Sequence, residues 1–172
     1  MYDLTLILGG ARSGKSRFSE AEITALPAPW VYIATAQAWD DEMRARIAQH
    51  RDRREMGWMT REEPLALAAL LGTLPEGAPV LVDCLTLWLT NHLLAEHDLG
   101  AEYAALEHAL HARRGPVWLV ANEVGLGIVP DNALARRFRD EAGVLNQRMA
   151  TLATRVIFVA AGLPLHLKGG PG

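Results

Sequence analysis

The most constraining feature of the sequence is a glycine-rich stretch near the N-terminus. Residues 9–16 read Gly-Gly-Ala-Arg-Ser-Gly-Lys-Ser and match the pattern G-x-x-x-x-G-K-[ST] at every specified position. An apolar run at residues 4–8 precedes the stretch, and residues 17–25 can continue as a helix. A buried strand, a turn and a helix N-terminus form the context of a phosphate-binding loop. An ordinary glycine-rich turn with an unrelated lysine is the alternative, and the complete match disfavours it.

The residues of such a loop have different roles. The backbone N–H groups converge on phosphate oxygens, the lysine reaches the β- and γ-phosphates, and the last hydroxyl ligates Mg²⁺. We therefore expect Lys15 to act on the transferred phosphate and Ser16 to ligate the metal. The loop residues expected to bind nucleotide are Gly9, Gly10, Ala11, Arg12, Ser13, Gly14, Lys15 and Ser16.

A second expected metal ligand ends a later apolar strand. Residues 80–83 read Val-Leu-Val-Asp. A strand that ends in an acid is the usual partner of a phosphate-binding loop, because the carboxylate lies near the Mg²⁺ shell. Asp83 is therefore a predicted metal ligand. Its alternative role is to cap the helix predicted over residues 85–94.

The hydrophobic periodicity predicts an α/β fold. Apolar strands are expected at residues 4–8, 30–35, 80–83, 117–121 and 156–160. Helical patterns separate them, and one of these helices is expected to begin at Pro64. Residues 57–61 are irregular or a short strand, and residues 162–168 are interpreted as a tail. We predict a doubly wound, mostly parallel sheet flanked by helices, of the P-loop NTPase type, in a single domain over residues 1–172.

Composition limits the expected partners and the expected location of the protein. The formal net charge is −3, which gives no bulk attraction to nucleic acid. No apolar run reaches the ~18 residues that a membrane span needs, and no basic leader precedes the first strand, so we expect a cytoplasmic protein without membrane insertion. Cys84 is the one cysteine and is expected to be a small buried residue. His92, His97, His108 and His111 lack metal-ligand spacing and are expected at the surface.

Two further segments are candidates for ligand contact. Residues 39–54 begin with acids and then become arginine-rich, which on composition alone favours a solvated helix with ion pairs over a cleft-facing one. Residues 122–130 read Asn-Glu-Val-Gly-Leu-Gly-Ile-Val-Pro and follow a predicted strand. Ligands bind at the carboxyl ends of strands in open α/β sheets, so this loop is expected near the site.

Together these segments closely resemble the bifunctional adenosylcobinamide kinase/adenosylcobinamide-phosphate guanylyltransferase family. The resemblance spans essentially the whole chain, and the Asn-Glu-Val-Gly to Ile-Val-Pro segment is more specific than the loop. The segments that carry it, in order, are residues 9–17, Tyr-Ile-Ala-Thr-Ala at 32–36, Asp-Asp-Glu-Met at 40–43, Arg-Ile at 46–47, His-Arg at 50–51, Asp-Cys-Leu-Thr at 83–86, residues 122–125 and 128–130, and then 135–136, 138–140, 143 and 146–147.

The resemblance implies two reactions of cobalamin nucleotide-loop assembly. The hydroxyl of adenosylcobinamide is phosphorylated with ATP or GTP. GMP from GTP then passes through a guanylyl-histidine intermediate to that phosphate, which gives adenosylcobinamide-GDP and pyrophosphate. The guanylylated residue of the family matches His50 here. A neutral imidazole is a competent nucleophile near pH 7, so His50 and Lys15 are the expected catalytic residues.

The resemblance also implies a GTP site, Mg²⁺ as the metal and a homotrimer. Glu62 and its neighbour Glu63 are alternatives for the acid of that site. The implied substrates are GTP, ATP, adenosylcobinamide and its phosphate, with no nucleic acid. The residues expected to bind nucleotide beyond the loop are Ile33, Ala34, Thr35, Arg51, Asp52, Arg53, Glu62 and Asp83.

Two other functions are compatible with a phosphate-binding loop. One is a small-molecule kinase without a guanylyl step, and the other is a nucleotide-gated regulatory module that hydrolyses slowly and binds a protein partner. A guanine-specific switch protein would carry Asn-Lys-x-Asp after a late strand. The chain has Asn-Glu-Val-Gly at residues 122–125 instead, which disfavours a regulatory GTPase.

Overall fold

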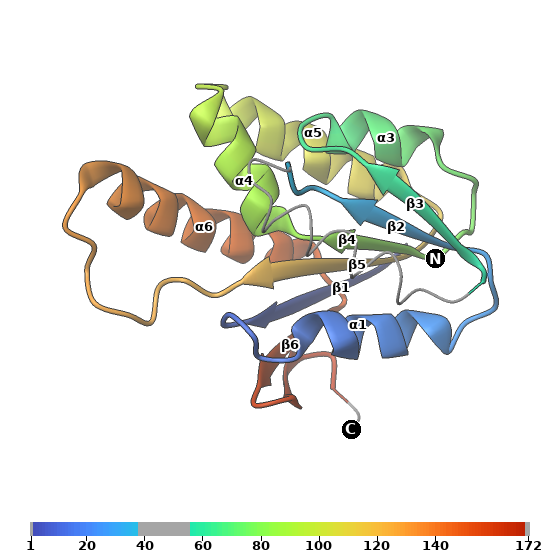
Figure 1. The fold of residues 1–172 in the computed structure, drawn as a ribbon. Coiled ribbons are helices and arrows are strands. Elements are labelled where there is room, and N and C mark those ends of the chain that lie inside the picture. The colour runs from blue at the N-terminus through green and yellow to red at the C-terminus, as the bar shows by residue number, and fades with distance from the viewer. Residues whose placement is uncertain (1, 38–55, 171–172) are drawn as a thin grey trace.

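Strands and helices alternate along most of the chain in the computed structural model, which describes residues 2–37 and 56–170 (Figure 1). The elements are β1 (Tyr2–Gly9), α1 (Lys15–Thr24), β2 (Trp30–Ala34), β3 (Trp58–Glu62), α3 (Leu67–Thr73), β4 (Val80–Asp83), α4 (Leu85–Leu94), α5 (Leu99–Ala112), β5 (Gly115–Asn122), α6 (Ala133–Leu152), β6 (Arg155–Ala160) and β7 (Leu163–Lys168).

The strands of the described residues form one seven-stranded sheet in the order β3-β2-β4-β5-β1-β6-β7. Every neighbouring pair is parallel except β6 and β7. The predicted doubly wound, mostly parallel sheet is therefore confirmed. Strand β5 lies between β1, which leads into the glycine-rich loop, and β4, which ends at Asp83.

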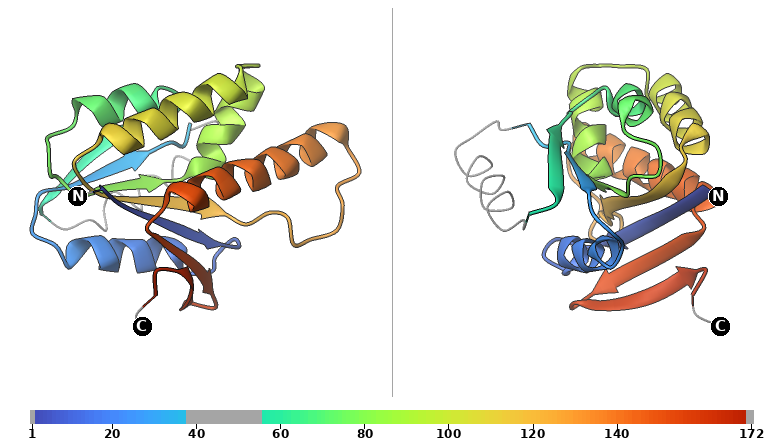
Figure 2. Two further views of the ribbon diagram at one scale, coloured as in Figure 1. Left: turned by 180° about the vertical axis from the view of Figure 1, so that it is seen from behind. Right: turned by 90° about the vertical axis from the view of Figure 1, so that its right-hand side faces the viewer.

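The two faces of the sheet carry separate hydrophobic cores. Helices α3 to α6 cover one face, and α1 lies on the other, as the end-on view in Figure 2 shows. The larger core joins the sheet to α3, α4, α5 and α6, with Leu6, Trp88 and Leu145 almost completely buried. The smaller core packs Ile23 of α1 against residues such as Trp118. Burial on both faces explains why the inner strands are continuous apolar runs.

Three expectations about this fold were wrong in detail. Residues 163–168, interpreted as a tail, form the antiparallel strand β7, whose side chains are all exposed. Helix α3 begins at Leu67 rather than at Pro64, because the Glu63 carboxylate accepts hydrogen bonds from Leu65 N and Ala66 N and forms a turn first. His92, expected at the surface, is 1 % exposed.

The expectations for Cys84 and for three of the histidines hold. Cys84 is buried, and burial raises the pKa of its thiol to about 11, as expected for a structural residue rather than a reactive thiolate. His97, His108 and His111 are exposed. Among the described helices, none is long and apolar enough to cross a membrane.

Candidate functional site

The carboxyl ends of neighbouring strands bring the predicted site residues to one edge of the sheet. Gly9 at the end of β1 pairs with Asn122 at the end of β5. Ala34 at the end of β2 pairs with Asp83 on one side and with Glu62 on the other. Figure 1 shows the glycine-rich loop and the long loop after β5 at this same edge. The strand register therefore gathers segments that lie up to about 110 residues apart in the chain.

The glycine-rich loop turns tightly from β1 into α1. Gly14 has φ of 95° and is the N-cap of α1, a conformation that favours glycine. A side chain at Gly9 would lie 2.5 Å from both Ser13 Oγ and Val159 O, so the close approach also requires glycine. Ser13 N donates to Gly10 O at 3.3 Å, and Ser13 O accepts from Gly162 N at 2.7 Å. The first N–H groups of a helix have no partner within the helix and point toward the residues before it, so the start of α1 at Lys15 directs them at the loop, as an anion site requires.

Lys15 places its ammonium inside this loop. Its side chain is 8 % exposed, and Nζ donates to Gly10 O at 2.9 Å. Desolvation by burial lowers the pKa of Lys15, while the negative charge of Asp83 opposes the shift. A partly desolvated ammonium interacts strongly with phosphate, because little water has to be displaced when the charges meet.

Asp83 and Ser16 offer the oxygen donors that Mg²⁺ prefers. Asp83 Oδ2 accepts a hydrogen bond from Tyr32 OH at 3.1 Å, which fixes the carboxylate at the strand end. The N-cap of α4 is Cys84 rather than Asp83, so the alternative capping role does not apply. Ser16 lies in the first turn of α1. A hydroxyl and a carboxylate, with phosphate oxygens and water, make a chemically suitable magnesium shell.

Thr35 determines the geometry of the chain around Asp83. Its side chain is fully buried, and Oγ1 both donates to Cys84 O at 2.6 Å and accepts from Cys84 N at 2.9 Å. Thr35 N donates to Asp83 O at 3.3 Å, and Thr35 O accepts from Asn91 Nδ2 at 2.9 Å. The polar atoms of Thr35 are therefore used within the protein. Its geometry supports positioning of the Asp83 carboxylate rather than side-chain contact with a nucleotide.

Replacing Thr35 with valine should weaken both the fold and the site. Valine keeps the shape but leaves the buried Cys84 N without its partner, whereas Cys84 O still accepts from Trp88 N at 3.2 Å. A buried unsatisfied group costs about 1–3 kcal/mol. We expect the free energy of unfolding to fall by that order in urea titrations, together with a loss of nucleotide affinity. Thr35→Ser keeps the hydroxyl and is the matched control. Equal losses in the valine and serine variants would contradict the role of the hydroxyl.

Ile33 and Ala34 lie just before Thr35 and are also buried. The Ile33 side chain belongs to the larger core, and Ala34 O accepts from Glu63 N at 2.9 Å. Glu62 and Glu63 differ clearly: Glu62 is exposed at the end of β3, whereas Glu63 Oε1 is bonded to backbone N–H groups before α3. The Glu63 carboxylate is therefore used in the turn before α3, and the Glu62 carboxylate is not.

The sequence analysis assigned no role to two polar residues of α4 that join the strand ends. Thr86 Oγ1 accepts from Asn122 N at 2.7 Å. Asn91 Nδ2 donates to Thr35 O and to Pro64 O, both at 2.9 Å. Both residues are buried. The available signal was their position in an otherwise strongly apolar helix, where a buried polar side chain needs a specific partner.

Asn122 and Glu123 connect the loop after β5 to the glycine-rich loop. Glu123 N donates to Gly9 O at 3.0 Å, and Glu123 Oε1 accepts from Gly125 N at 2.5 Å. Asn146 Nδ2 of α6 donates to Asn122 O at 3.5 Å.

Four predicted site residues lie outside the described residues: His50, Arg51, Asp52 and Arg53.

The sheet, the loop between β1 and α1, and a strand-end carboxylate, Asp83, whose charge acts on Lys15 define a P-loop nucleotide-binding protein. The fold is similar to that of a solved ATPase from the type III secretion system of pathogenic bacteria, with a TM-score of 0.53 and 10 % identity over 96 % of this chain and 57 % of that chain. Residues 5–167 match the model of the CobU family, described as cobinamide kinase / cobinamide phosphate guanyltransferase. The chain belongs to this family.

Two curated relatives cover nearly the whole chain. The bifunctional adenosylcobalamin biosynthesis protein CobP of Pseudomonas aeruginosa is 54 % identical over 169 residues, which is 96 % of this chain and 98 % of that protein. The bifunctional adenosylcobalamin biosynthesis protein CobU of Salmonella typhimurium is 44 % identical over 184 residues, with 96 % and 99 % coverage. The family resemblance inferred from the sequence motifs is confirmed.

Proposed function

We propose that the chain is a bifunctional enzyme that phosphorylates adenosylcobinamide and then guanylylates the product, with one domain over residues 1–172 carrying both activities. The observation that carries this proposal is the gathering of Lys15, Asp83 and Asn122 at one sheet edge, in a chain of this family. That edge offers a phosphate-binding loop, an acid suited to Mg²⁺ and the family-specific segment 122–130. The substrates would be ATP or GTP, adenosylcobinamide and its phosphate.

In the kinase step the substrate hydroxyl oxygen attacks the γ-phosphorus, and the nucleoside diphosphate leaves. The loop N–H groups and Lys15 stabilise the charge that spreads over the phosphate oxygens. Ser16 and Asp83 would hold Mg²⁺, which neutralises charge on the β- and γ-phosphates when bound. Thr35 and Tyr32 keep Asp83 in position through the hydrogen bonds described above.

In the guanylyl step a ring nitrogen of His50 attacks the α-phosphorus of GTP, and pyrophosphate leaves. A phosphate oxygen of adenosylcobinamide phosphate then attacks the guanylyl phosphorus, which releases His50 and forms adenosylcobinamide-GDP. Arg51 and Arg53 would bind phosphate oxygens, with Asp52 beside them in the same GTP site. Glu62 is the better of the two candidate acids, since the Glu63 carboxylate is occupied in the turn before α3.

Assembly and location are part of the same proposal. A homotrimer is expected, and the exposed apolar side chains of Leu126, Ile128 and Val129 support burial of the loop after β5 against another surface. We also propose a cytoplasmic enzyme without membrane insertion and without a nucleic-acid partner, consistent with the net charge of −3.

Product analysis tests the function directly. The purified protein is incubated with Mg²⁺, adenosylcobinamide and GTP. The corrinoid products are then separated by chromatography and identified by mass spectrometry. We expect adenosylcobinamide-GDP, and accumulation of adenosylcobinamide phosphate when ATP replaces GTP. Formation of the phosphate alone in both reactions would favour a kinase without a guanylyl step. Nucleotide hydrolysis without any corrinoid product would favour a regulatory module.

A further inference from the structure

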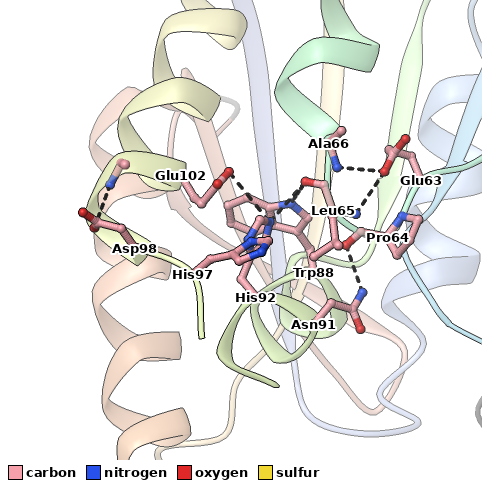
Figure 3. A network of polar contacts seen from close by, with 11 residues as sticks. Glu63, Pro64, Leu65, Ala66, Trp88, Asn91, His92, His97, Asp98 and Glu102 are labelled. Carbon is pink, nitrogen blue, oxygen red and sulfur yellow. Dashed lines mark hydrogen bonds and ion pairs between the residues drawn. The ribbon is translucent and has the colours of Figure 1, made fainter. Parts of the chain in front are cut away.

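Two histidines and a glutamate meet where α4 passes into α5 (Figure 3). His92 Nδ1 lies 2.9 Å from His97 Nδ1, and His92 Nε2 lies 3.9 Å from Glu102 Oε2. In the part of the chain that the structure describes, these residues are the one group of three or more His, Cys, Asp or Glu residues whose potential ligand atoms all lie within 4.8 Å of one another. The cluster lies outside the nucleotide edge described above.

The backbone explains why His97 returns to His92. Glu96, which follows the C-cap residue Ala95 of α4, adopts a left-handed conformation with φ of 56°. Glu96 N donates to Leu93 O at 3.2 Å, and His97 N donates to His92 O at 3.1 Å. This pair of bonds is a Schellman motif, in which the residue after the turn packs against the last turn of the helix. The two imidazoles are therefore brought together by the way α4 ends.

Helix α5 supplies the carboxylate from the other side. Asp98 caps the helix by accepting a hydrogen bond from Ala101 N at 3.2 Å. Glu102 consequently lies in the first turn of α5, where a negative charge is favourable. The C-terminus of α4 and the N-terminus of α5 are thus both fixed by local hydrogen bonds. The backbone therefore determines how His92, His97 and Glu102 lie relative to one another.

The orientation of His92 is fixed by its neighbours. The residue is 1 % exposed, and its ring packs edge-on against Trp88 at a centroid distance of 4.6 Å. His92 Nε2 lies 3.1 Å from Leu65 O. Because a carbonyl only accepts, Nε2 carries the hydrogen and Nδ1 of a neutral ring offers a lone pair. Burial lowers the pKa of His92, which favours the neutral ring.

We propose that His92 Nδ1, His97 Nδ1 and the Glu102 carboxylate bind a divalent transition-metal ion, with Zn²⁺ as the best match. Two imidazoles and one carboxylate are a recognised zinc ligand set, with water as the fourth ligand. Bonds of about 2.0–2.1 Å in tetrahedral geometry separate two nitrogens by about 3.3 Å, which is about 0.4 Å more than the present contact. Binding also requires both rings to turn so that their Nδ1 lone pairs converge, and the Glu102 carboxylate, now 3.9 Å from His92 Nε2, to rotate toward the Nδ1 side.

The groups around the two imidazole rings also fit a metal site. Leu65 O accepts from His92 Nε2, and a backbone carbonyl in this position is a usual outer partner of a ligating histidine. Without metal, the close Nδ1 contact is a hydrogen bond from His97 to His92. On binding, the His97 proton moves from Nδ1 to Nε2 by exchange with water, which the exposure of His97 permits.

Metal binding would stabilise the position of Pro64 and Leu65, which follow Glu62 and Glu63 in the chain. Leu65 O also accepts from Trp88 Nε1 at 2.9 Å, and the adjacent Pro64 O accepts from Asn91 Nδ2 at 2.9 Å. Asn91 bonds to Thr35 O as well. Fixing the ring of His92 would therefore stabilise one end of a network that reaches the nucleotide edge. The role is structural, and the metal is distinct from the proposed Mg²⁺ of the phosphate loop.

The test is a titration of the chelator-treated full chain with Co²⁺ and Zn²⁺. We expect one equivalent of Co²⁺ to give the visible absorption of tetrahedral cobalt, and Zn²⁺ to displace it. His97→Ala and Glu102→Gln should each weaken binding at least about tenfold. These two side chains are less buried than His92, so the variants should fold even where a His92 variant does not.

Two control variants separate this site from other histidines. His108→Ala removes an exposed histidine of α5, and His50→Ala removes the proposed nucleophile; both should bind cobalt like the parent protein. Binding that is absent in the parent, or undiminished in both His97→Ala and Glu102→Gln, would overturn the proposal and leave the cluster as a hydrogen-bonded contact between α4 and α5. Binding lost in His50→Ala would also overturn it, because the metal would then lie elsewhere.

Discussion

His50→Ala should eliminate the guanylyl-enzyme and leave the phosphorylation of adenosylcobinamide in place. Alanine offers no atom that can attack the α-phosphorus, so GMP transfer should fall by about 1000-fold or more, as happens when a covalent nucleophile is removed. The kinase step depends on the loop around Lys15 and does not need this imidazole. The two reactions should therefore separate in a single variant.

The measurement uses GTP labelled at the α-phosphate and, in a parallel sample, ATP with adenosylcobinamide. Label bound to the parent protein should be stable in base and lost in acid, as expected for a phosphoramidate. The control variant His108→Ala should retain both the adduct and the kinase activity. An undiminished adduct in His50→Ala would remove this residue from the mechanism, whereas loss of both activities would indicate a shared structural defect.

Lys15→Met should suppress the kinase reaction by about 100- to 1000-fold in kcat. Methionine retains most of the apolar stem but removes the ammonium that would stabilise charge on the phosphates, and loss of one such contact costs about 2.7–4 kcal/mol of activation free energy. The desolvated position of Lys15, which lowers its pKa, makes the interaction with phosphate stronger than at an exposed site. The effect should appear mainly in kcat, because the charge develops in the transition state.

The matched control is Arg114→Met, which removes a positive charge from an exposed residue just before β5, at the opposite edge of the sheet. Initial rates of adenosylcobinamide phosphate formation at saturating ATP compare the two variants. Unchanged turnover in Lys15→Met would place the kinase reaction outside this loop. Equal losses in both variants would point to a general effect of charge.

The sequence patterns predicted the inner part of the fold well, for a physical reason. Strands buried on both faces have continuous apolar sequences, so β1, β2, β4, β5 and β6 could be recognised directly. Strand β7 has neither face buried, and its alternating Leu163, Leu165 and Leu167 are interrupted by Pro164. The start of α3 depends on a side chain, Glu63, that competes with the helix for backbone N–H groups.

The site residues that belong to a local sequence motif could be predicted. Those that depend on contacts between distant side chains could not. Lys15 and Asp83 could be paired in advance because loop and strand-end acid are linked by a common chemistry. The bonds from Thr35 to Cys84 join residues 49 positions apart, and no pattern in either segment indicates them. The spacing of His92 and His97 predicts two surface residues and no metal site, because the left-handed turn at Glu96 that brings the two rings together is visible only in three dimensions.

The position of β5 between β1 and β4 determines how a nucleotide crosses this edge. Neighbouring strands lie about 4.8 Å apart, so the ends of β1 and β4, which flank β5, are separated by about 10 Å. A phosphate chain held by both Lys15 and Asp83 would therefore lie across the end of β5, which is marked by Asn122.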